Sequence, residues 1–360
     1  MRFSTTLSIL TAISSPIAYA AQSFSGSSLY YAAGLTSSQR QTLFSGMRDA
    51  GAKVLRVWLD GASPPQKGTD IQGFGALETD SPGQWDDTVL NRIDDLMVDA
   101  ASYGIKLHIS MHSYNALSGN WDFYGKWYGT GSFYTSDDAF GYFGNRLKHI
   151  LAHKNQHTNK TWAESSEYIF AFEPQNEAMH GLENPSALTA WQCRVSQLIK
   201  DNLKSDILVS TGGGMNLANS VLDDYFECAA LDIIGIHVYY YDEFSASRLQ
   251  PYIKKAQSAG KILIMQEWGV CYYDSPSQSC SRSGVLNSST RDSNIRSWAG
   301  SMNSVGLPWM YWQILPNADP HGVDWDYEIG INDVNWGALK EMGVKAGQSQ
   351  CAFDLSKRLL

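Results

Sequence analysis

Short apolar runs alternate with longer amphipathic stretches along most of the chain. Apolar runs of about four to eight residues between turn residues are typical of buried strands, and an apolar spacing of three to four residues is typical of helices. The predicted strands span residues 28–33, 53–58, 105–111, 168–173, 206–211, 232–238, 262–267 and 308–313. The predicted helices span residues 36–50, 85–103, 137–153, 186–203, 245–258 and 290–304.

This alternation of strand and helix predicts an α/β fold, a single (β/α)8 TIM barrel. A doubly wound parallel sheet is the alternative. That fold would normally carry a glycine-rich phosphate-binding turn after an early strand. The run Gly212–Gly214 follows the fifth predicted strand and lacks the required spacing, so it is better explained as a plain turn. Neither a linker nor an internal repeat divides the chain, which favours one domain.

The N-terminus has the pattern of a secretory signal peptide. A positive charge precedes a short apolar run, and Ala18–Ala20 matches a small-residue cleavage site. We therefore expect a signal peptide over residues 1–20, too short to span a membrane, and a mature domain over residues 21–360. Two N-glycosylation sequons, at Asn159 and Asn287, agree with export. The predicted location is secreted and extracellular.

Export exposes cysteines to an oxidising compartment. The chain has five: Cys193, Cys228, Cys271, Cys280 and Cys351. Four of them could form two bridges and leave one free. Pairing Cys271 with Cys280 would close a short loop, and pairing Cys193 with Cys228 would tie consecutive α/β units. The pattern lacks the CxxC pairs of a structural zinc site and the HExxH motif of a metal hydrolase. We expect neither a metal nor another cofactor.

Charge and aromatic content narrow the class of ligand. The formal net charge is -9 and the isoelectric point about 5.3, which disfavours nucleic acid and anionic membranes as partners. A neutral ligand fits better. The chain has 12 Trp, 19 Tyr and 13 Phe, and aromatic faces stack on sugar rings. An aromatic-rich core would explain the same numbers, so composition alone leaves both interpretations open.

Carboxylates at strand ends suggest a chemistry. In a (β/α)8 barrel, the active site lies at the C-terminal ends of the strands. Glu177 follows the fourth predicted strand and Glu267 ends the seventh. Two facing carboxylates suit glycoside hydrolysis, in which one donates a proton and the other attacks the anomeric carbon. Arg56, on the second strand, could keep one of them ionised. Salt-bridged rim carboxylates are the alternative explanation.

Five short motifs in barrel order resemble glycoside hydrolase family 5. Asn176–Glu177 resembles the end of its fourth strand, and Gln266–Gly269 the end of its seventh. Leu55–Trp58 is similar to its strand-two arginine segment, His237–Tyr239 to its His-x-Tyr motif, and Tyr311–Gln313 to its strand-eight tryptophan. The resemblance covers residues from about 28 to 340. It departs from the family where alanine, instead of the usual proline, follows the strand-four glutamate.

The resemblance implies a role for each matching residue. Glu177 would be the acid/base and Glu267 the nucleophile of a retaining β-glycosidase. Asn176 would bind the 2-hydroxyl of the reacting sugar. Arg56 and Tyr239 would hold the nucleophile ionised and oriented.

Other matching residues are implied as substrate contacts. His237 would touch the acid/base or the sugar, Trp312 would form the floor of the reacting subsite, and His112 would contact a sugar hydroxyl. Aromatic residues on the rim would stack on further sugars of the chain. Those expected on the rim are Trp58, Trp121, Trp127 and Trp268.

The segments 56–58, 119–125 and 133–135 resemble fungal endo-β-1,4-mannanases, whereas His112–Tyr114 resembles endo-β-1,4-glucanases. We therefore expect an endo-acting enzyme that hydrolyses β-1,4-mannan-type polysaccharide by double displacement. The alternatives are an endo-β-1,4-glucanase (cellulase), another β-glucanase of the family, and a non-catalytic carbohydrate-binding barrel. The expected partner is a polysaccharide or oligosaccharide substrate, bound by a monomer.

Overall fold

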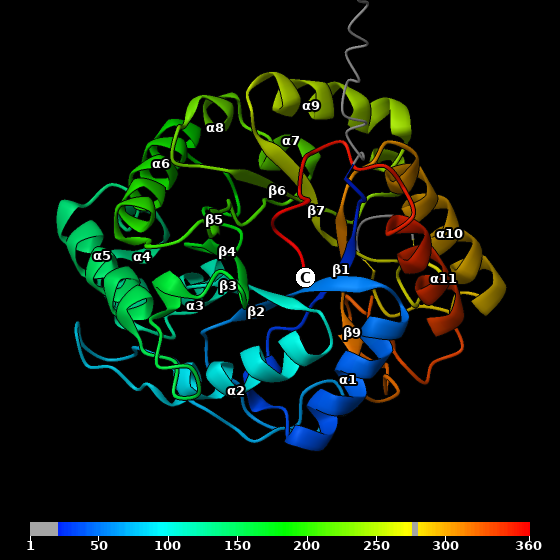
Figure 1. Ribbon diagram of the computed structural model, residues 1–360, viewed down its shortest axis with the longest axis horizontal. Helices are drawn as coiled ribbons and strands as arrows, with labels where there is room; N and C mark the ends of the chain where they lie inside the picture. The colour runs from blue at the N-terminus through cyan, green and yellow to red at the C-terminus, as the bar shows by residue number, and fades with distance from the viewer. Residues whose placement is uncertain (1–20, 276–279) are drawn as a thin grey trace, which may run out of the picture.

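The computed structural model describes residues 21–275 and 280–360, so the predicted signal peptide, residues 1–20, lies outside the described residues. Eight parallel strands line the centre of the molecule (Figure 1). They are β1 (Ser25–Ser28), β2 (Ala52–Trp58), β3 (Lys106–Ser110), β4 (Ile169–Glu173), β5 (Leu208–Val209), β6 (Ile233–Val238), β7 (Ile262–Trp268) and β8 (Trp309–Trp312). Their order around the sheet is β5-β4-β3-β2-β1-β8-β7-β6. This is the predicted (β/α)8 barrel.

The barrel closes between β5 and β6 by a single contact. β5 has two residues and pairs with β4 only through them. One parallel bridge, between Ser210 and Ile233, joins the two ends of the sheet. The β6–β7 pair, in contrast, has six paired positions. The hydrogen-bonded wall of the barrel is therefore thinnest at β5–β6.

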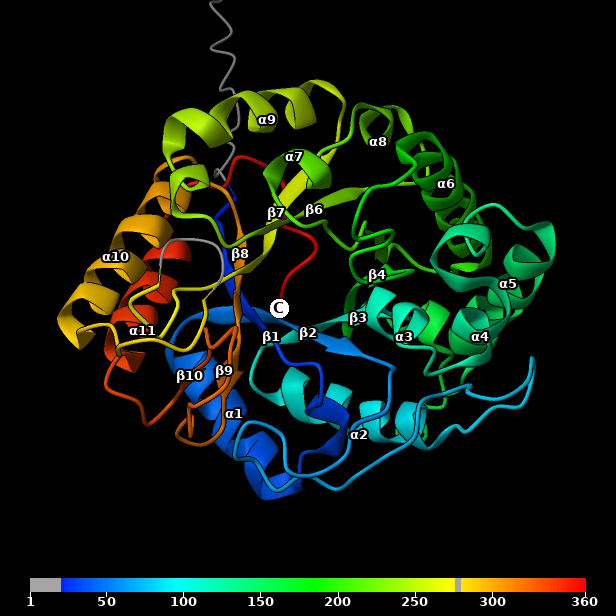
Figure 2. The ribbon, with the colours of Figure 1, turned by 180° about the vertical axis from the view of Figure 1, so that it is seen from behind.

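Helices surround the strands (Figures 1 and 2). The helices are α1 (Ser37–Asp49), α2 (Thr88–Ser102), α3 (Tyr114–Ser118), α4 (Phe123–Ser132), α5 (Asp137–Ala152), α6 (Pro185–Asn202), α7 (Leu217–Ser220), α8 (Asp223–Glu227), α9 (Ala246–Ser258), α10 (Ser288–Ser304) and α11 (Trp336–Ala346). A two-stranded sheet, β9 (Ile314–Leu315) with β10 (Ile329–Gly330), follows β8. All six predicted helices are present. In the described part of the chain, every helix is too short or too polar to cross a membrane.

The first strand is not where the pattern predicted it. Residues 28–33 were expected to form it, but β1 is Ser25–Ser28, and Ala32–Gly34 forms a 3-10 helix. Small residues are required in β1 because its neighbours approach closely. A Cβ atom on Gly26 would lie 2.4 Å from the carbonyl oxygen of Val54. A strand of serine and glycine has no apolar run for periodicity to detect.

Two disulfides cross-link the described chain. Cys193 pairs with Cys228, and Cys271 pairs with Cys280. Both predicted pairings are confirmed. Cys351 is buried and has a free thiol. The Cys193–Cys228 bridge joins α6 to the segment after α8, and these elements precede β5 and β6 respectively.

Candidate active site

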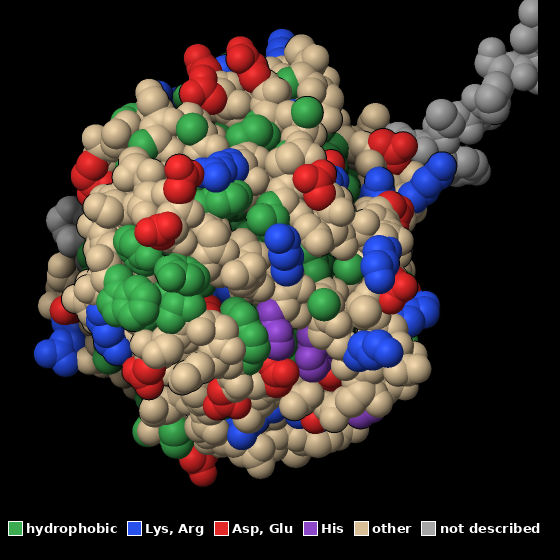
Figure 3. All heavy atoms as spheres, turned by 90° about the vertical axis from the view of Figure 1, so that its left-hand side faces the viewer, with side chains coloured by type: hydrophobic (Ala, Val, Ile, Leu, Met, Phe, Trp, Pro, Cys, Tyr) green, Lys and Arg blue, Asp and Glu red, His purple; other side chains and the backbone are tan. Residues whose placement is uncertain are grey.

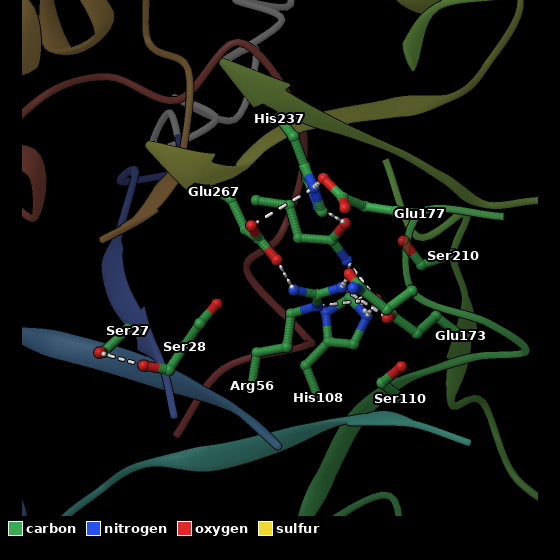
Figure 4. A network of polar contacts seen from close by, with 12 residues as sticks. Ser27, Ser28, Arg56, His108, Ser110, Glu173, Glu177, Ser210, His237 and Glu267 are labelled. Carbon is green, nitrogen blue, oxygen red and sulfur yellow. Dashed lines mark hydrogen bonds and ion pairs between the residues drawn. The ribbon is translucent and has the colours of Figure 1, made fainter. Parts of the chain in front are cut away.

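Polar side chains from β2, β6 and β7 and from the segment after β4 converge at the C-terminal end of the barrel. Glu177 and Glu267 point toward each other, and His237 lies between them (Figure 4). One oxygen of each carboxylate and one nitrogen of His237 all lie within 4.8 Å of one another. Arg56 reaches Glu267 from the barrel interior (Figure 4). The structure therefore brings together the two strand ends at which the sequence analysis placed the carboxylates.

Arg56 is the central cation of the site. Its side chain is fully buried and donates from Nε and Nη2 to the two oxygens of Glu173, at 2.9 and 2.6 Å. Nη1 donates to Glu267 Oε1 at 2.5 Å, and Nη2 also donates to Asn176 Oδ1 at 2.6 Å. The guanidinium group is planar and has five N–H donors. One arginine side chain can therefore orient all three acceptor side chains.

Glu267 is held at both oxygens. Arg56 binds Oε1, and the Tyr239 hydroxyl donates to Oε2 at 2.9 Å. Burial raises the pKa of Glu267, and the charge of Glu177 adds to this effect, whereas His237 and Arg56 oppose it. The carboxylate is 4% exposed, so its orientation depends on these partners and not on solvent.

Glu177 lies in a strained turn after β4. Its φ is +48°, in the left-handed region, where a non-glycine residue costs about 1–3 kcal/mol. Two histidines contact its carboxylate: His237 Nδ1 lies 3.0 Å from Oε1 and His180 Nδ1 lies 3.1 Å from Oε2. Burial acts to raise the pKa of Glu177, but the hydrogen bonds from these histidines outweigh burial and lower it. The turn thus aims the carboxylate at Glu267 and places it between two imidazoles.

Hydrogen bonds fix which nitrogen of His237 carries a proton. Gln266 donates through Nε2 to the buried carboxylate of Glu173 at 2.5 Å, so its Oε1 atom faces His237 as an acceptor. The His237 Nε2 atom, 3.1 Å away, must therefore be the donor. The 3.0 Å contact between His237 Nδ1 and Glu177 also needs one hydrogen. One proton is thus shared between His237 and Glu177.

The sequence analysis missed the buried layer below the carboxylates. His108, on β3, lies 3.1 Å from Glu173, and Gln266 joins Glu173 to His237. All four side chains are completely buried. The polar residues His108 on β3 and Gln266 on β7 were the available signal, because a buried polar side chain needs a partner.

The aromatic residues near the carboxylates form one cluster. The Trp312 ring is partly exposed, stacks against Tyr30 at 6.2 Å and meets the edge of Trp58 at 5.7 Å. Trp58 is only 3% exposed, and the Arg56 guanidinium lies 4.2 Å from its ring centroid. Trp312 therefore offers the open face of the pair, and Trp58 supports it from below.

Three predicted sugar contacts are wrong. Trp58 was expected to stack on a sugar from the rim, but it is only 3% exposed and packs against Arg56 and Trp312. His112 is fully buried, with Nε2 bound to Asp122 at 2.7 Å and Nδ1 bound to Gln175 at 2.8 Å, so both of its polar atoms are occupied. Trp268 was expected on the rim, but it is fully buried in the core and packs against Trp309 at 5.3 Å. The side chains of His112 and Trp268 point into the protein and not into the cleft.

Between β9 and β10 lies another cluster of histidine and carboxylate side chains, which are residue types that can bind a metal. His321 Nδ1 is 3.2 Å from Asp319 and 3.1 Å from Asp326. Burial lowers the pKa of His321, but hydrogen bonds to the two carboxylates raise it to about 9. Here, as at Glu177, His237 and Glu267, the nitrogen and oxygen atoms that could bind a metal already pair with one another.

Curated proteins with related sequences carry the name mannan endo-1,4-beta-mannosidase. Mannan endo-1,4-beta-mannosidase 5 of Solanum lycopersicum is 29% identical over 163 residues, which cover 42% of this chain and 36% of the relative. Probable mannan endo-1,4-beta-mannosidase A-1 of Aspergillus terreus is 28% identical over 209 residues, which cover 54% of this chain and 50% of the relative. The chain thus matches about a third to a half of the length of these relatives.

Solved structures with the same fold are more complete matches. The endo-1,4-beta-mannanase from Rhizomucor miehei has a TM-score of 0.70 at 19% identity, over 91% of this chain and 96% of that one. The endoglucanase Cel5A of Pseudomonas stutzeri has a TM-score of 0.57 at 13% identity, over 89% of this chain and 94% of that one. The family model described as cellulase (glycosyl hydrolase family 5) matches residues 15–318. This match spans most of the chain, and the protein therefore belongs to glycosyl hydrolase family 5.

Proposed function

We propose that the protein is a secreted, retaining endo-β-glycanase that hydrolyses β-1,4-mannan-type polysaccharide. The observation that carries the retaining mechanism is the closeness of the two carboxylates, since an oxygen of Glu177 lies within 4.8 Å of an oxygen of Glu267. Retaining glycosidases have carboxyl groups about 5–5.5 Å apart, whereas inverting enzymes need about 6.5–9.5 Å to fit a water molecule. The short distance supports double displacement.

In the first step, Glu267 attacks the anomeric carbon and forms a covalent glycosyl-enzyme while the glycosidic C–O bond breaks. Arg56 and Tyr239 orient the attacking carboxylate. Glu177 donates its proton to the leaving oxygen, and the proton shared with His237 is the source. In the second step, Glu177 takes a proton from water, the water oxygen bonds to the anomeric carbon, and Glu267 is released.

Asn176 and Trp312 are proposed to position the reacting sugar. Asn176 accepts from Arg56 through Oδ1, which leaves its Nδ2 donors for the 2-hydroxyl. A hydrogen bond at this hydroxyl strengthens as the oxocarbenium-like transition state develops. The exposed face of Trp312 would stack on the sugar ring. The curated relatives favour mannan as the polymer.

Endo-β-1,4-glucanase activity is the second candidate. The endoglucanase of Pseudomonas stutzeri shares the fold, and the matching family model carries the description cellulase. The two activities differ in whether the reacting sugar has an axial or an equatorial 2-hydroxyl. A non-catalytic barrel is disfavoured because both carboxylates and their supporting residues are in place.

The test is a substrate comparison with the purified protein. We expect hydrolysis of β-mannan with retained anomeric configuration, and little hydrolysis of carboxymethyl cellulose or β-1,3-glucan. The Glu267→Ala variant should lose turnover on every substrate. Preferred hydrolysis of cellulose would refute the mannan specificity, and inversion would refute the mechanism. Sequencing the N-terminus of the secreted protein tests cleavage after Ala20. Gel filtration tests whether the protein is a monomer.

A further inference from the structure

The segment that carries Glu177 leaves the barrel through an irregular turn, and one phenol hydroxyl binds this turn on both sides of the glutamate. Tyr134 donates from its hydroxyl to Gln175 Oε1 at 2.7 Å, and the same hydroxyl accepts from the backbone N–H of Met179 at 2.6 Å. We propose that Tyr134 is a positioning residue, which acts on the reaction by holding Glu177 where it can donate its proton. The inference rests on the proposed function, in which Glu177 is the acid/base.

The side chain of Tyr134 is directed inward, toward the turn. Tyr134 comes two residues after the end of α4, on the side of the molecule formed by α4, α5 and α6 (Figures 1 and 3). Hydrophobic side chains gather at one edge of this side (Figure 3), but Tyr134 is only 5% exposed. Its two partners, Gln175 and Met179, are buried as well. Both hydrogen bonds are therefore shielded from bulk water.

The packing around Tyr134 fixes its ring, and burial keeps its hydroxyl protonated. The ring lies edge-to-face against Trp191 at 5.1 Å and against Phe133 at 5.2 Å. Burial raises the pKa of Tyr134 well above its ordinary value, and the hydrogen bond from the Met179 N–H opposes this rise without cancelling it. The hydroxyl therefore remains a donor to Gln175 while it accepts from Met179.

The turn depends on such an anchor because its backbone is strained. Both Glu177 and Met179 have a φ of +48°, in the left-handed region that is costly for residues other than glycine. Up to Glu177, the backbone is bonded to the segments that follow β3 and β5: Asn176 N–H donates to His112 O, and Glu177 N–H donates to Gly212 O, both at 2.9 Å. Beyond Glu177, the Met179 N–H binds the tyrosine side chain instead. Without that hydroxyl, the strained dihedral angles can relax.

Relaxation of the turn would move the proton donor relative to the nucleophile. Of the two histidines that contact Glu177, His180 belongs to the turn and would move with it. His237 and Glu267, in contrast, lie on β6 and β7 and would stay with the barrel. The position of Glu177 relative to Glu267 is therefore set by the anchors of the turn, and Tyr134 supplies the anchor beyond the glutamate.

The experiment compares a substrate that needs a proton donor with one that does not. We measure kcat/KM for mannohexaose and for a dinitrophenyl β-mannobioside, whose leaving group departs without protonation. This constant covers the steps up to the glycosyl-enzyme, so the later role of Glu177 as a base does not enter. Tyr134→Phe removes only the hydroxyl. A positioned acid contributes about 10²–10⁴-fold, and we expect this variant to lower the ratio of the hexaose value to the dinitrophenyl value about ten-fold.

Three further variants show whether Tyr134 acts through Glu177. Tyr124→Phe is the matched control and should keep the wild-type ratio, because Tyr124 is also buried but donates to Glu78 at 2.9 Å and not to the turn. Gln175→Met removes the acceptor of the Tyr134 hydroxyl and should lower the ratio as well, which gives a second variant if Tyr134→Phe does not fold. In a Glu177→Ala background, Tyr134→Phe should cause no further loss on mannohexaose.

The outcomes separate the positioning role from the proposed function. An unchanged ratio for Tyr134→Phe, an equal fall for Tyr124→Phe, or a further loss in the Glu177→Ala background would overturn the positioning role and leave the proposed function intact. Cellohexaose and a dinitrophenyl β-cellobioside are assayed in parallel, and a selective fall seen only with these would support the role and refute mannan as the polymer.

An inactive wild-type protein would still allow a decision. If it hydrolyses neither hexaose, the proposed function fails, and a crystal structure of Tyr134→Phe then tests the position of the glutamate without any substrate. A Glu177 carboxylate that has moved out of contact with His237 supports the positioning role. A carboxylate that keeps this contact refutes the role.

Discussion

Replacing Arg56 with methionine tests whether one buried cation organises the active site. The substitution keeps a chain of similar length and removes the guanidinium from Glu173, Glu267 and Asn176. Both carboxylates would then remain buried without the guanidinium, because Glu173 is 0% and Glu267 4% exposed. Breaking a buried ion pair by removing one partner costs about 3–5 kcal/mol.

Since one arginine pairs with two buried carboxylates, we expect the free energy of unfolding to fall by an amount at the upper end of this range, about 5 kcal/mol at pH 7. For ~340 residues the entropy of unfolding is about 0.7 kcal/mol/K, so this loss lowers the melting temperature by about 7 °C. Thermal unfolding followed by circular dichroism measures it. Arg194→Met is the control: Arg194 is 53% exposed and pairs with Asp137 at the surface, so its loss should stay below about 1 kcal/mol.

The stability loss of Arg56→Met should depend on pH in a defined direction. In the wild-type protein, burial acts to raise the pKa of Glu173, but Arg56 and His108 lower it well below its ordinary value. This contribution to stability is present above the ordinary pKa of glutamate and is lost as pH falls through the lowered pKa. In Arg56→Met, burial would raise the pKa of Glu173, so acid would relieve the buried charge. The stability difference between variant and wild type should therefore shrink from pH 7 to pH 5.

Two results would refute this account of Arg56. One is a loss below about 2 kcal/mol at pH 7, against the expected 3–5 kcal/mol or more. The other is a deficit that stays constant between pH 7 and pH 5. As a further check, the double variant Arg56→Met with Glu173→Gln should lose less stability than the sum of the two single variants, because the residues are coupled.

Three further predictions concern the acid/base and one disulfide. Glu177→Ala should slow hydrolysis of mannan by about 10²–10⁴-fold but spare an aryl glycoside with a good leaving group, which needs no proton donor; equal losses on both substrates in steady-state assays would argue against the acid role. His180→Asn removes a hydrogen bond that lowers the pKa of Glu177, so the basic limb of kcat/KM should move to higher pH, and an unmoved limb would contradict the contact. Replacing Cys193 and Cys228 by serine opens a loop with a sequence separation of 35 and should cost about 4 kcal/mol in urea unfolding, whereas wild-type stability would show that the bridge does not constrain the unfolded chain.

The sequence predicted the strands whose apolar runs are long. The predicted spans 53–58 and 262–267 correspond closely to β2 and β7. It failed at β1 because tight packing there requires small residues, and Gly26 leaves no room for a Cβ. It also overestimated β5, which has two residues although residues 206–211 were predicted. Strand length depends on partners that periodicity does not describe.

The facing carboxylates were predictable from the sequence, whereas the side chains that hold them in place were not. Glu177 and Glu267 follow from their places at strand ends. Gln266 and Glu267 are adjacent in β7, yet both are buried, although alternation would turn one of them away from the site. The pairing of β6 with β7 shifts register between Ile236 and His237, which breaks strict alternation near these residues. Such an irregularity depends on the neighbouring strand.

His180 was missed for a different reason. It lies three residues after Glu177, but in a turn with positive φ at Glu177 and Met179 and not in a helix. Its contact with the carboxylate depends on these two unusual dihedral angles. A spacing of three residues carries no geometric meaning outside regular structure, so only the folded chain reveals the contact.

The disulfide between Cys193 and Cys228 lies where the barrel has least backbone pairing. It links the elements that precede β5 and β6, and these strands meet at one bridge. A covalent link between the preceding segments thus reinforces a junction of strands that has only one backbone bridge. Reducing this disulfide should leave the seven other contacts between neighbouring strands nearly unchanged. The β5–β6 contact should open more often, so the amide protons of β5 and β6 would exchange first. Glu177 N–H donates to the carbonyl oxygen of Gly212, just beyond β5. The oxidation state of the Cys193–Cys228 disulfide is therefore linked to the position of the proton donor.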